Sequence, residues 1–175
     1  DISNKLQYDL TNKTKADQVR EKIRRAGREV QNIISNLEEN SENSKNIKFL
    51  IVIEGQSSKI PFNDNDWQNN ETLSYLRAKF LKKFWTDPVS EGGCGLFQRT
   101  SENDVNSKCE IIVAGSGEGG VPRYYYKGGI NPVSQNPAEE KYSSIKNVSP
   151  EDFAAWRNVE QRNQRFLINI IPIIG

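Results

Sequence analysis

Arg77 is the side chain whose type and position point most directly to binding. It lies within residues 69–84, where apolar side chains recur every three or four residues, as on the core-facing side of a helix. Those apolar residues are Leu73, Leu76, Phe80, Leu81 and Phe84. Because Arg77 borders this face, its guanidinium needs a partner there. Two interpretations stay open: Arg77 holds an anionic ligand at the mouth of a pocket, or it forms a salt bridge with an acid such as Glu54.

Catalysis is disfavoured by what the chain lacks. It contains no histidine, which removes the commonest general base and most zinc sites. Glu54 and Glu118 are the acids expected at strand ends and are the candidates for a catalytic carboxylate pair, but neither has a lysine or cysteine partner at a known spacing. The glycines between residues 115 and 120 lack the ending of a phosphate-binding loop and predict a tight turn. We therefore expect a protein that is not an enzyme and that uses no metal and no cofactor.

The overall composition limits the partners further. A length of 175 residues suits one domain with a real core. The 24 basic and 23 acidic residues leave a net charge of +1, so there is no electrostatic reason to expect nucleic acid or an acidic membrane surface as a partner. No run of about 18 apolar residues occurs, so no transmembrane helix is predicted. Because the chain lacks methionine, we expect a processed protein or an excised domain.

Cys94 and Cys109 are the only two cysteines, and they flank a polar stretch that resembles a loop. A disulfide between them would suit an oxidising compartment. Two separate thiols are the alternative, and the sequence does not decide between the two.

The hydrophobic pattern predicts alternating helices and strands. A helix is expected from about residue 14 to 37, and buried strands are expected at residues 47–55 and from Cys109 to the following glycines. Ser149 followed by proline predicts the start of a helix that reaches about Asn163, and residues 165–174 close the chain as a strand. A short strand is also predicted near the N-terminus, at Leu6, Tyr8 and Leu10. This order predicts an α/β (α+β) two-layer sandwich.

Three features of this pattern leave alternatives. The first helix carries apolar residues at a spacing that suits either packing on a sheet, which we favour, or a coiled-coil seam: Val19, Ile23, Ala26, Val30, Ile33 and Leu37. The helix at residues 69–84 has Asn70 or Thr72 as its expected N-cap, and Asp87-Pro88 should stop it. Residues 119–148 are expected to form an irregular insertion, in which Tyr124, Tyr125 and Tyr126 form either a sticky exposed patch or loop packing.

Three separated segments resemble the OmpA-like peptidoglycan-binding domain family. The resemblance covers residues 47 to 172, and the gap between Gly55 and Asn70 is closest in length to that of the flagellar stator subunit MotB. The first segment is similar to the family's Asn-x-x-Leu-Ser-x-x-Arg-Ala helix, the second to its Gly-x-Gly-Glu-x-x-Pro turn, and the third to its closing Asn-Arg-Arg-Val-x-Ile element. The matching residues are Asn70, Leu73, Ser74, Arg77 and Ala78; Gly115, Gly117, Glu118 and Pro122; and Asn163, Arg165 and Ile168.

The resemblance implies a fold and a division of the chain. The family has a β-α-β-α-β-α-β order with a mixed sheet. Residues 47–175 would form the OmpA/MotB-like domain with an insertion at about 119–148. Residues 1–46 would be an N-terminal segment and a long helix that packs on the domain or leads into it.

The resemblance also implies a ligand. In the family, an arginine at the Arg77 position and an aspartate grip the diaminopimelate of a peptidoglycan stem peptide. The aspartate position is Ser58 here, and Asn70 and Leu73 would help to shape the pocket. Asn163 and Arg165 would close it. A guanidinium matches the ligand carboxylate in a bidentate manner, while Ser58 would accept a hydrogen bond from the ammonium group.

Ser58 is the main departure from the family pattern. The family turn Gly-His-Thr-Asp is Gly-Gln-Ser-Ser here, and Lys59 follows it. A serine supplies no charge for the ammonium group, and Asp64 or Asp66 is a candidate substitute from the same loop. The alternative function is therefore an OmpA-like fold that has lost wall binding and serves as a protein-interaction or dimerisation domain.

The resemblance finally implies a setting. The module would be the periplasmic part of a membrane-anchored, stator-type protein whose anchor lies upstream of Asp1. Its partners would be the peptidoglycan stem peptide and membrane-embedded subunits. A homodimer with the long first helix near the two-fold axis is expected.

Overall fold

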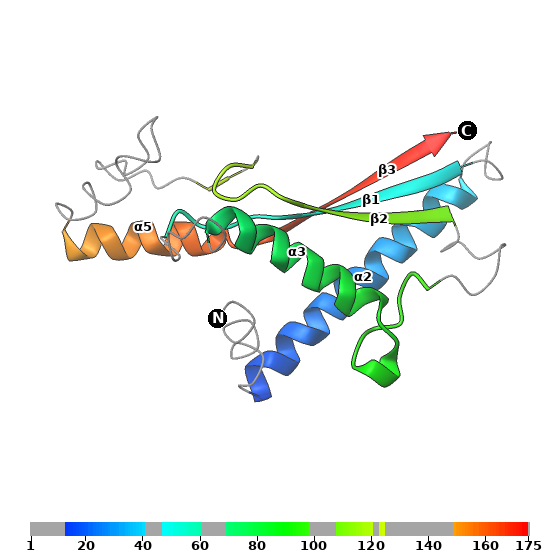
Figure 1. Cartoon of the computed structure of the whole chain (residues 1–175), viewed down its shortest axis with the longest axis horizontal. Helices are drawn as coiled ribbons and strands as arrows, with labels where there is room; N and C mark the ends of the chain where they lie inside the picture. The colour runs from blue at the N-terminus through cyan, green and yellow to red at the C-terminus, as the bar shows by residue number, and fades with distance from the viewer. Residues whose placement is uncertain are drawn as a thin grey trace.

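The computed structural model describes residues 13–40, 47–60, 69–98, 108–120, 123–124 and 149–174. Three long helices and three strands lie in this part of the chain, together with a short 3₁₀ turn at Val89–Glu91 (Figure 1). In chain order the long elements are α2 (Lys13–Glu39), β1 (Ile47–Gly55), α3 (Asn70–Thr86), β2 (Cys109–Gly115), α5 (Pro150–Arg162) and β3 (Phe166–Ile174). The predicted strand at Leu6, Tyr8 and Leu10 lies outside the described residues.

The three strands form a mixed sheet in the order β2-β1-β3. β1 and β2 run parallel, with Gly55 opposite Gly115 at their carboxyl ends. β3 runs antiparallel to β1, so that Phe166 also lies opposite Gly55. The order of elements and the mixed sheet confirm the predicted α/β class.

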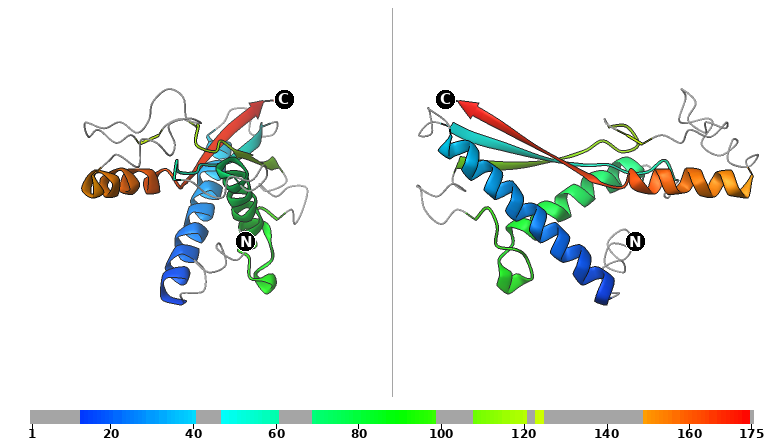
Figure 2. Two further views of the ribbon diagram at one scale, coloured as in Figure 1. Left: turned by 60° about the vertical axis from the view of Figure 1, so that its left-hand side comes forward. Right: turned by 180° about the vertical axis from the view of Figure 1, so that it is seen from behind.

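The two faces of the sheet differ in their cover. On β1, Phe49, Ile51 and Ile53 point to the face that is fully buried. Both α2 and α3 lie on this side of the sheet (Figure 2), and their buried side chains join the same core cluster. On the opposite face Ile112, Ile171 and Ile173 are 40–47% exposed. α2 and α3 thus form one layer and the sheet the other, which confirms the two-layer arrangement, whereas α5 lies beyond the end of the sheet (Figure 1).

The long helix α2 packs on this core with one side only. Val30 and Ile34 are buried in the core cluster, whereas Ile33 and Leu37 of the predicted seam are exposed. The favoured interpretation was packing on a sheet; Val30 and Ile34 join a core cluster that contains Phe49 and Ile51 of β1, and α2 also meets α3. No described helix has an apolar stretch of the length needed to cross a bilayer.

A hydrogen bond from a side chain of α3 to the main chain of α2 fixes where the two helices meet. Trp85 Nε1 donates a hydrogen bond to the Ile23 carbonyl at 2.9 Å. A Cβ at Gly27 would lie 2.6 Å from Leu96 Cδ1 and 2.9 Å from Trp85 Nε1. The indole approaches the backbone of α2 because residue 27 has no side chain.

The start of α3 differs from the prediction. Asn69, rather than Asn70 or Thr72, is the N-cap, and its side chain accepts a 2.8 Å hydrogen bond from Thr72 N. The helix ends at Thr86, before Asp87 and the following proline, as predicted.

The buried side of α3 is also rotated from the predicted stripe. Phe80 was expected in the core but is 44% exposed, whereas Ser74 and Ala78 are fully buried. Helices pack at a distance set by the side chains at the contact, so small residues face the sheet where the backbones approach most closely. Apolar periodicity alone misses this because it gives a serine no weight.

Two strand-end glycines make the close approach of α3 to the sheet feasible. A Cβ at Gly55 would lie 2.0 Å from the Ser74 carbonyl oxygen, and a Cβ at Gly115 would lie 2.6 Å from Tyr75 N. Both distances are far inside van der Waals contact and involve backbone atoms. The helix can therefore touch the ends of β1 and β2 only if both positions lack side chains.

The two cysteines are thiols in the structure and do not form the disulfide that was one of the two predicted alternatives. Cys109 is buried at the start of β2, and Cys94 is half-buried near Arg24. Burial raises the pKa of the Cys94 thiol above its ordinary value, although the Arg24 guanidinium acts in the opposite direction. Cys94 is therefore expected to be a poorly reactive thiol.

We expect Gly55→Ala to destabilise the protein by about 3 kcal/mol, the upper end of the range for overpacked cores. The added methyl group meets a helix backbone that cannot move without disrupting α3. The free energy of unfolding, measured by urea denaturation, tests this. Ala154→Ser, which adds one heavy atom at an exposed position of α5, is the matched control and should change stability by less than about 0.5 kcal/mol. Equal stability of the two variants would contradict the packing described here.

Candidate functional site

The three sequence motifs meet at one end of the sheet. This end holds the carboxyl ends of β1 and β2, the amino end of α3, the carboxyl end of α5 and the start of β3 (Figure 1). Main-chain hydrogen bonds join the loops there: Gln56 N donates to Arg165 O, and Ser57 N donates to Gly117 O, both at 2.9 Å. Residues from three distant segments are thereby held next to one another.

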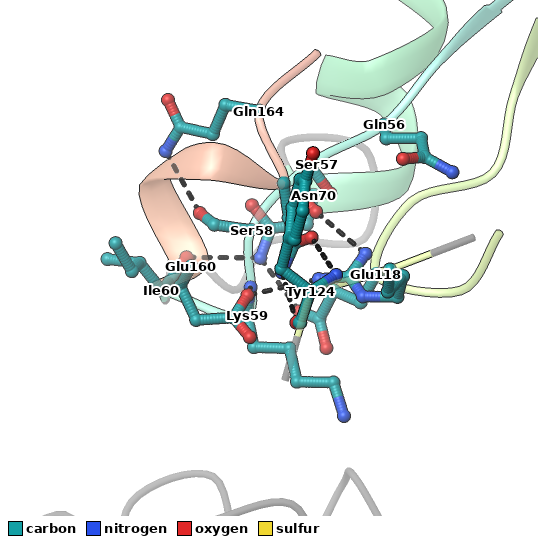
Figure 3. A network of polar contacts seen from close by, with 12 residues as sticks. Gln56, Ser57, Ser58, Lys59, Ile60, Asn70, Glu118, Tyr124, Glu160 and Gln164 are labelled. Carbon is teal, nitrogen blue, oxygen red and sulfur yellow. Dashed lines mark hydrogen bonds and ion pairs between the residues drawn. The ribbon is translucent and has the colours of Figure 1, made fainter. Parts of the chain in front are cut away.

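Asn70 links α3 to the two neighbouring loops. Its Nδ2 donates to Glu118 Oε1 at 2.7 Å and to the Ile60 carbonyl at 3.1 Å (Figure 3). The Asn70 side chain is buried. Asn70 therefore has a structural task in this arrangement, with Glu118 as one of its hydrogen-bond partners.

The glycine-rich segment after β2 is the tight turn that the sequence predicts. Gly117 and Gly120 have φ values of 56° and 74°, in the left-handed region that glycine adopts readily. Gly119 N donates to Ser116 O at 2.9 Å, and Gly117 N donates to the buried Ser74 hydroxyl at 2.9 Å. The turn is thus fastened to the first half of α3.

A buried ion pair ties α5 to both loops. Arg123 Nη2 lies 3.0 Å from Glu160 Oε2, and the two side chains are only 4% and 3% exposed. The same carboxylate oxygen accepts a 2.7 Å hydrogen bond from Lys59 N. Arg123 Nη1 donates to the carbonyls of Ser57 and Gly119, each at 3.0 Å. Both Arg123 Nη atoms and the Glu160 carboxylate are therefore hydrogen-bonded, as a buried pair requires, whereas the buried Arg123 Nε has no partner among the described residues.

Asn163 holds the segment that follows this ion pair. Its Oδ1 accepts a hydrogen bond from Tyr124 N at 2.9 Å, and its Nδ2 donates one to Tyr124 O at 3.0 Å. The side-chain amide thus pairs with the backbone of Tyr124 as a hydrogen-bonded residue of a neighbouring strand would. The Tyr124 ring lies against two guanidinium groups, with Arg162 Cζ at 3.9 Å and Arg165 Cζ at 4.6 Å from the ring centroid. Tyr124 thus packs on the described arginines, while Tyr125 and Tyr126 lie outside the described residues.

Arg165 is engaged with the first loop. Its Nε donates to Gln56 Oε1 at 3.0 Å, and Gln56 Nε2 in turn contacts Glu54 Oε1 at 3.4 Å. The fully buried Gln56, which stands at the family's histidine position, thereby orients Arg165.

Ser58 and Arg77 are brought together by a third side chain. Gln164 Nε2 donates to Ser58 Oγ at 3.0 Å (Figure 3), and Gln164 Oε1 accepts from Arg77 Nη2 at 3.5 Å. Ser58 is buried and Arg77 is half-buried, while Gln164 is exposed to solvent. Leu73, one helical turn before Arg77, is buried and supports this side of α3. The predicted pair thus lies on either side of one carboxamide group.

The structure assembles all six residues predicted for the site at or beside this end of the sheet: Ser58, Asn70, Leu73, Arg77, Asn163 and Arg165. It also contains three residues that sequence reasoning missed, namely Arg123, Glu160 and Gln164. Gln164 stands between the two motif positions Asn163 and Arg165 but belongs to no motif itself. No local sequence pattern around Arg123 or Glu160 predicts a buried ion pair. The candidate substitutes Asp64 and Asp66 lie outside the described residues.

Comparison with protein-family models, with curated proteins and with solved structures gives no match for this chain. The likeness to the OmpA-like family therefore stays a prediction from the motif residues named above.

We expect Glu160→Gln to cost about 3 kcal/mol of stability, because it leaves the buried Arg123 charge without its counter-ion. Adding Arg123→Met should cost less than the sum of the two single changes, because the unpaired charge is removed as well. Urea denaturation of both single variants and the double variant measures the coupling. Glu151→Gln, at an exposed acid on the same helix, is the control. A Glu160→Gln variant as stable as this control would show that the pair contributes nothing.

Proposed function

We propose that this chain is a non-catalytic peptidoglycan-binding domain that anchors a larger, membrane-attached protein to the cell wall. One observation carries the proposal: Arg77 and Ser58, which come from different segments, hold the two ends of the same small polar group. A guanidinium and a hydroxyl at that spacing form a receptor for a group that has an acceptor at one end and a donor at the other.

The free end of diaminopimelate in a stem peptide has this polarity. It carries a carboxylate and an ammonium group on one carbon. Arg77 takes the carboxylate with its fork of donors, and Ser58 Oγ accepts a hydrogen bond from the ammonium group. A neutral acceptor in place of an acid weakens this second contact by roughly 1–2 kcal/mol, so we expect an affinity below that of an aspartate-bearing site.

The surroundings support a binding role rather than catalysis. Asn70, Asn163 and Arg165 make hydrogen bonds that hold the loops in place around Arg77 and Ser58. Their task in this proposal is to keep the receptor rigid, which lowers the entropy lost on binding. The proposal further includes a periplasmic location, a stator-type context with membrane-embedded partner subunits, and a homodimer, all of which follow from the resemblance.

Removal of the guanidinium tests the proposal directly. Purified diaminopimelate-containing peptidoglycan should retain the wild-type protein on centrifugation, and Arg77→Ala should weaken this binding about tenfold, since a charge-assisted contact is lost. Arg157→Ala removes the same charge from an exposed position of α5 and should bind as the wild type does.

Two results would overturn the proposal. Wild-type protein that stays in the supernatant at every peptidoglycan concentration excludes wall binding. Equal losses in Arg77→Ala and Arg157→Ala indicate general charge attraction in place of a site. Circular dichroism of the variants verifies that each is folded.

A second candidate function is supported by the face of the sheet that none of the described helices covers. Ile112, Ile171 and Ile173 are exposed on the face opposite to α2 and α3. Apolar side chains exposed on one face of a sheet favour an interaction site there. In this alternative, the domain no longer binds the wall and associates with a second copy of itself through the sheet.

Self-association through the sheet face would distinguish this candidate, because the homodimer of the first proposal has the long first helix near its two-fold axis. Sedimentation velocity should then give a dimer for the wild type and a monomer for Ile173→Lys, because a buried lysine opposes the contact. Val89→Lys places the same charge at an apolar residue that is exposed on the 3₁₀ turn, and it should leave the dimer intact. A monomeric wild type excludes this candidate.

A further inference from the structure

The carboxamide of Gln164 has a definite orientation between Arg77 and Ser58. Its amino group faces the Ser58 hydroxyl at 3.0 Å, and its carbonyl oxygen faces the Arg77 guanidinium at 3.5 Å (Figure 3 shows the first contact). A donor thus points at the acceptor of the site, and an acceptor points at its donor. This is the polarity that the proposed function assigns to the ammonium and carboxylate groups of the ligand.

We propose that Gln164 is an internal occupant of this site and sets its affinity and selectivity. This inference rests on the proposed function. The carboxamide makes contacts with Arg77 Nη2 and Ser58 Oγ when no ligand is present. A ligand must therefore displace it, and only a group that offers both a carboxylate and an ammonium makes stronger contacts than the neutral amide does.

The local structure allows this displacement without unfolding. The Gln164 side chain is exposed, and its contact with Arg77 is at the long limit of a hydrogen bond. Its backbone is held separately, because Gln164 N donates to Gln161 O and the neighbouring Asn163 is locked to Tyr124. Rotation of one flexible side chain therefore opens the site, while the loops around it stay in position.

The competing interpretation is that Gln164 is only a structural tie between the α5–β3 connection and the loop after β1. The two interpretations predict opposite effects of removing the side chain. If Gln164 is a structural tie, removal of its side chain loosens the loops and weakens binding. If Gln164 is an occupant, removal of its side chain ends its competition with the ligand for Arg77 and Ser58 and strengthens binding.

Binding to diaminopimelate-containing peptidoglycan by four proteins separates these outcomes: wild type, Gln164→Ala, Gln164→Glu and Gln161→Ala. We expect Gln164→Ala to bind about fivefold or more tightly than the wild type, because two neutral hydrogen bonds no longer have to be broken. Gln164→Glu should bind at least tenfold more weakly, because its carboxylate pairs with Arg77. Gln161→Ala, at an exposed glutamine in the last turn of α5, should equal the wild type.

The failure of this inference differs from the failure of the proposed function. If the wild type binds through Arg77 and Gln164→Ala binds equally or more weakly, Gln164 is a structural tie and the wall-binding proposal stands. If none of the four proteins binds, both proposals are wrong. If Gln164→Glu binds as tightly as Gln164→Ala, the carboxamide does not compete with the ligand for Arg77, and the inference is overturned.

Discussion

The contact between the backbone of α3 and the ends of β1 and β2 is the constraint on which the rest of the structure depends. Because Gly55 and Gly115 lack side chains, the backbone of α3 packs directly against the strand ends. The Ser74 side chain lies in this contact, and its hydroxyl accepts a hydrogen bond from Gly117 N in the turn after β2. The helix therefore has one permitted rotation about its axis. That rotation buries Leu73, exposes Phe80 and leaves Arg77 at the border of the core. The position of the Arg77 guanidinium thus follows from the lack of a side chain at Gly55 and at Gly115.

A second set of contacts holds the loops against this frame. The Arg123–Glu160 pair joins the loop after β1, the turn after β2 and the last turn of α5, and Asn163 adds a pair of backbone-like hydrogen bonds beside it. A buried ion pair is weak evidence of net stabilisation, because desolvation opposes the attraction of the charges. Its clearer effect is geometric, since each charge requires its partners at fixed places. The site is thereby confined to one arrangement of three separate chain segments.

The sequence allowed much of the fold to be predicted, and less of the site. Strand β1, the strands that begin near Cys109 and Phe166, the Ser149 cap and the stop at Asp87 each follow from local patterns that act within a few residues. The prediction of which side of α3 faces the sheet was wrong at Phe80. Close packing of the helix backbone on the strands places the small residues Ser74 and Ala78 there instead of larger apolar residues. Arg123 and Glu160 escaped prediction because their pairing depends on residues 37 positions apart. Gln164 was missed for a different reason: a neutral amide between two motif residues has no pattern of its own.

The way in which α2 is attached has a spectroscopic consequence. Trp85 is fully buried, and its indole N–H is bonded to a main-chain carbonyl of α2 in the space that Gly27 leaves open. Detachment of α2 would break that bond and admit water to the ring at the same moment. Once the emission of Trp67 and Trp156 is removed by substitution, the wavelength of the Trp85 emission therefore reports whether the long first helix is docked.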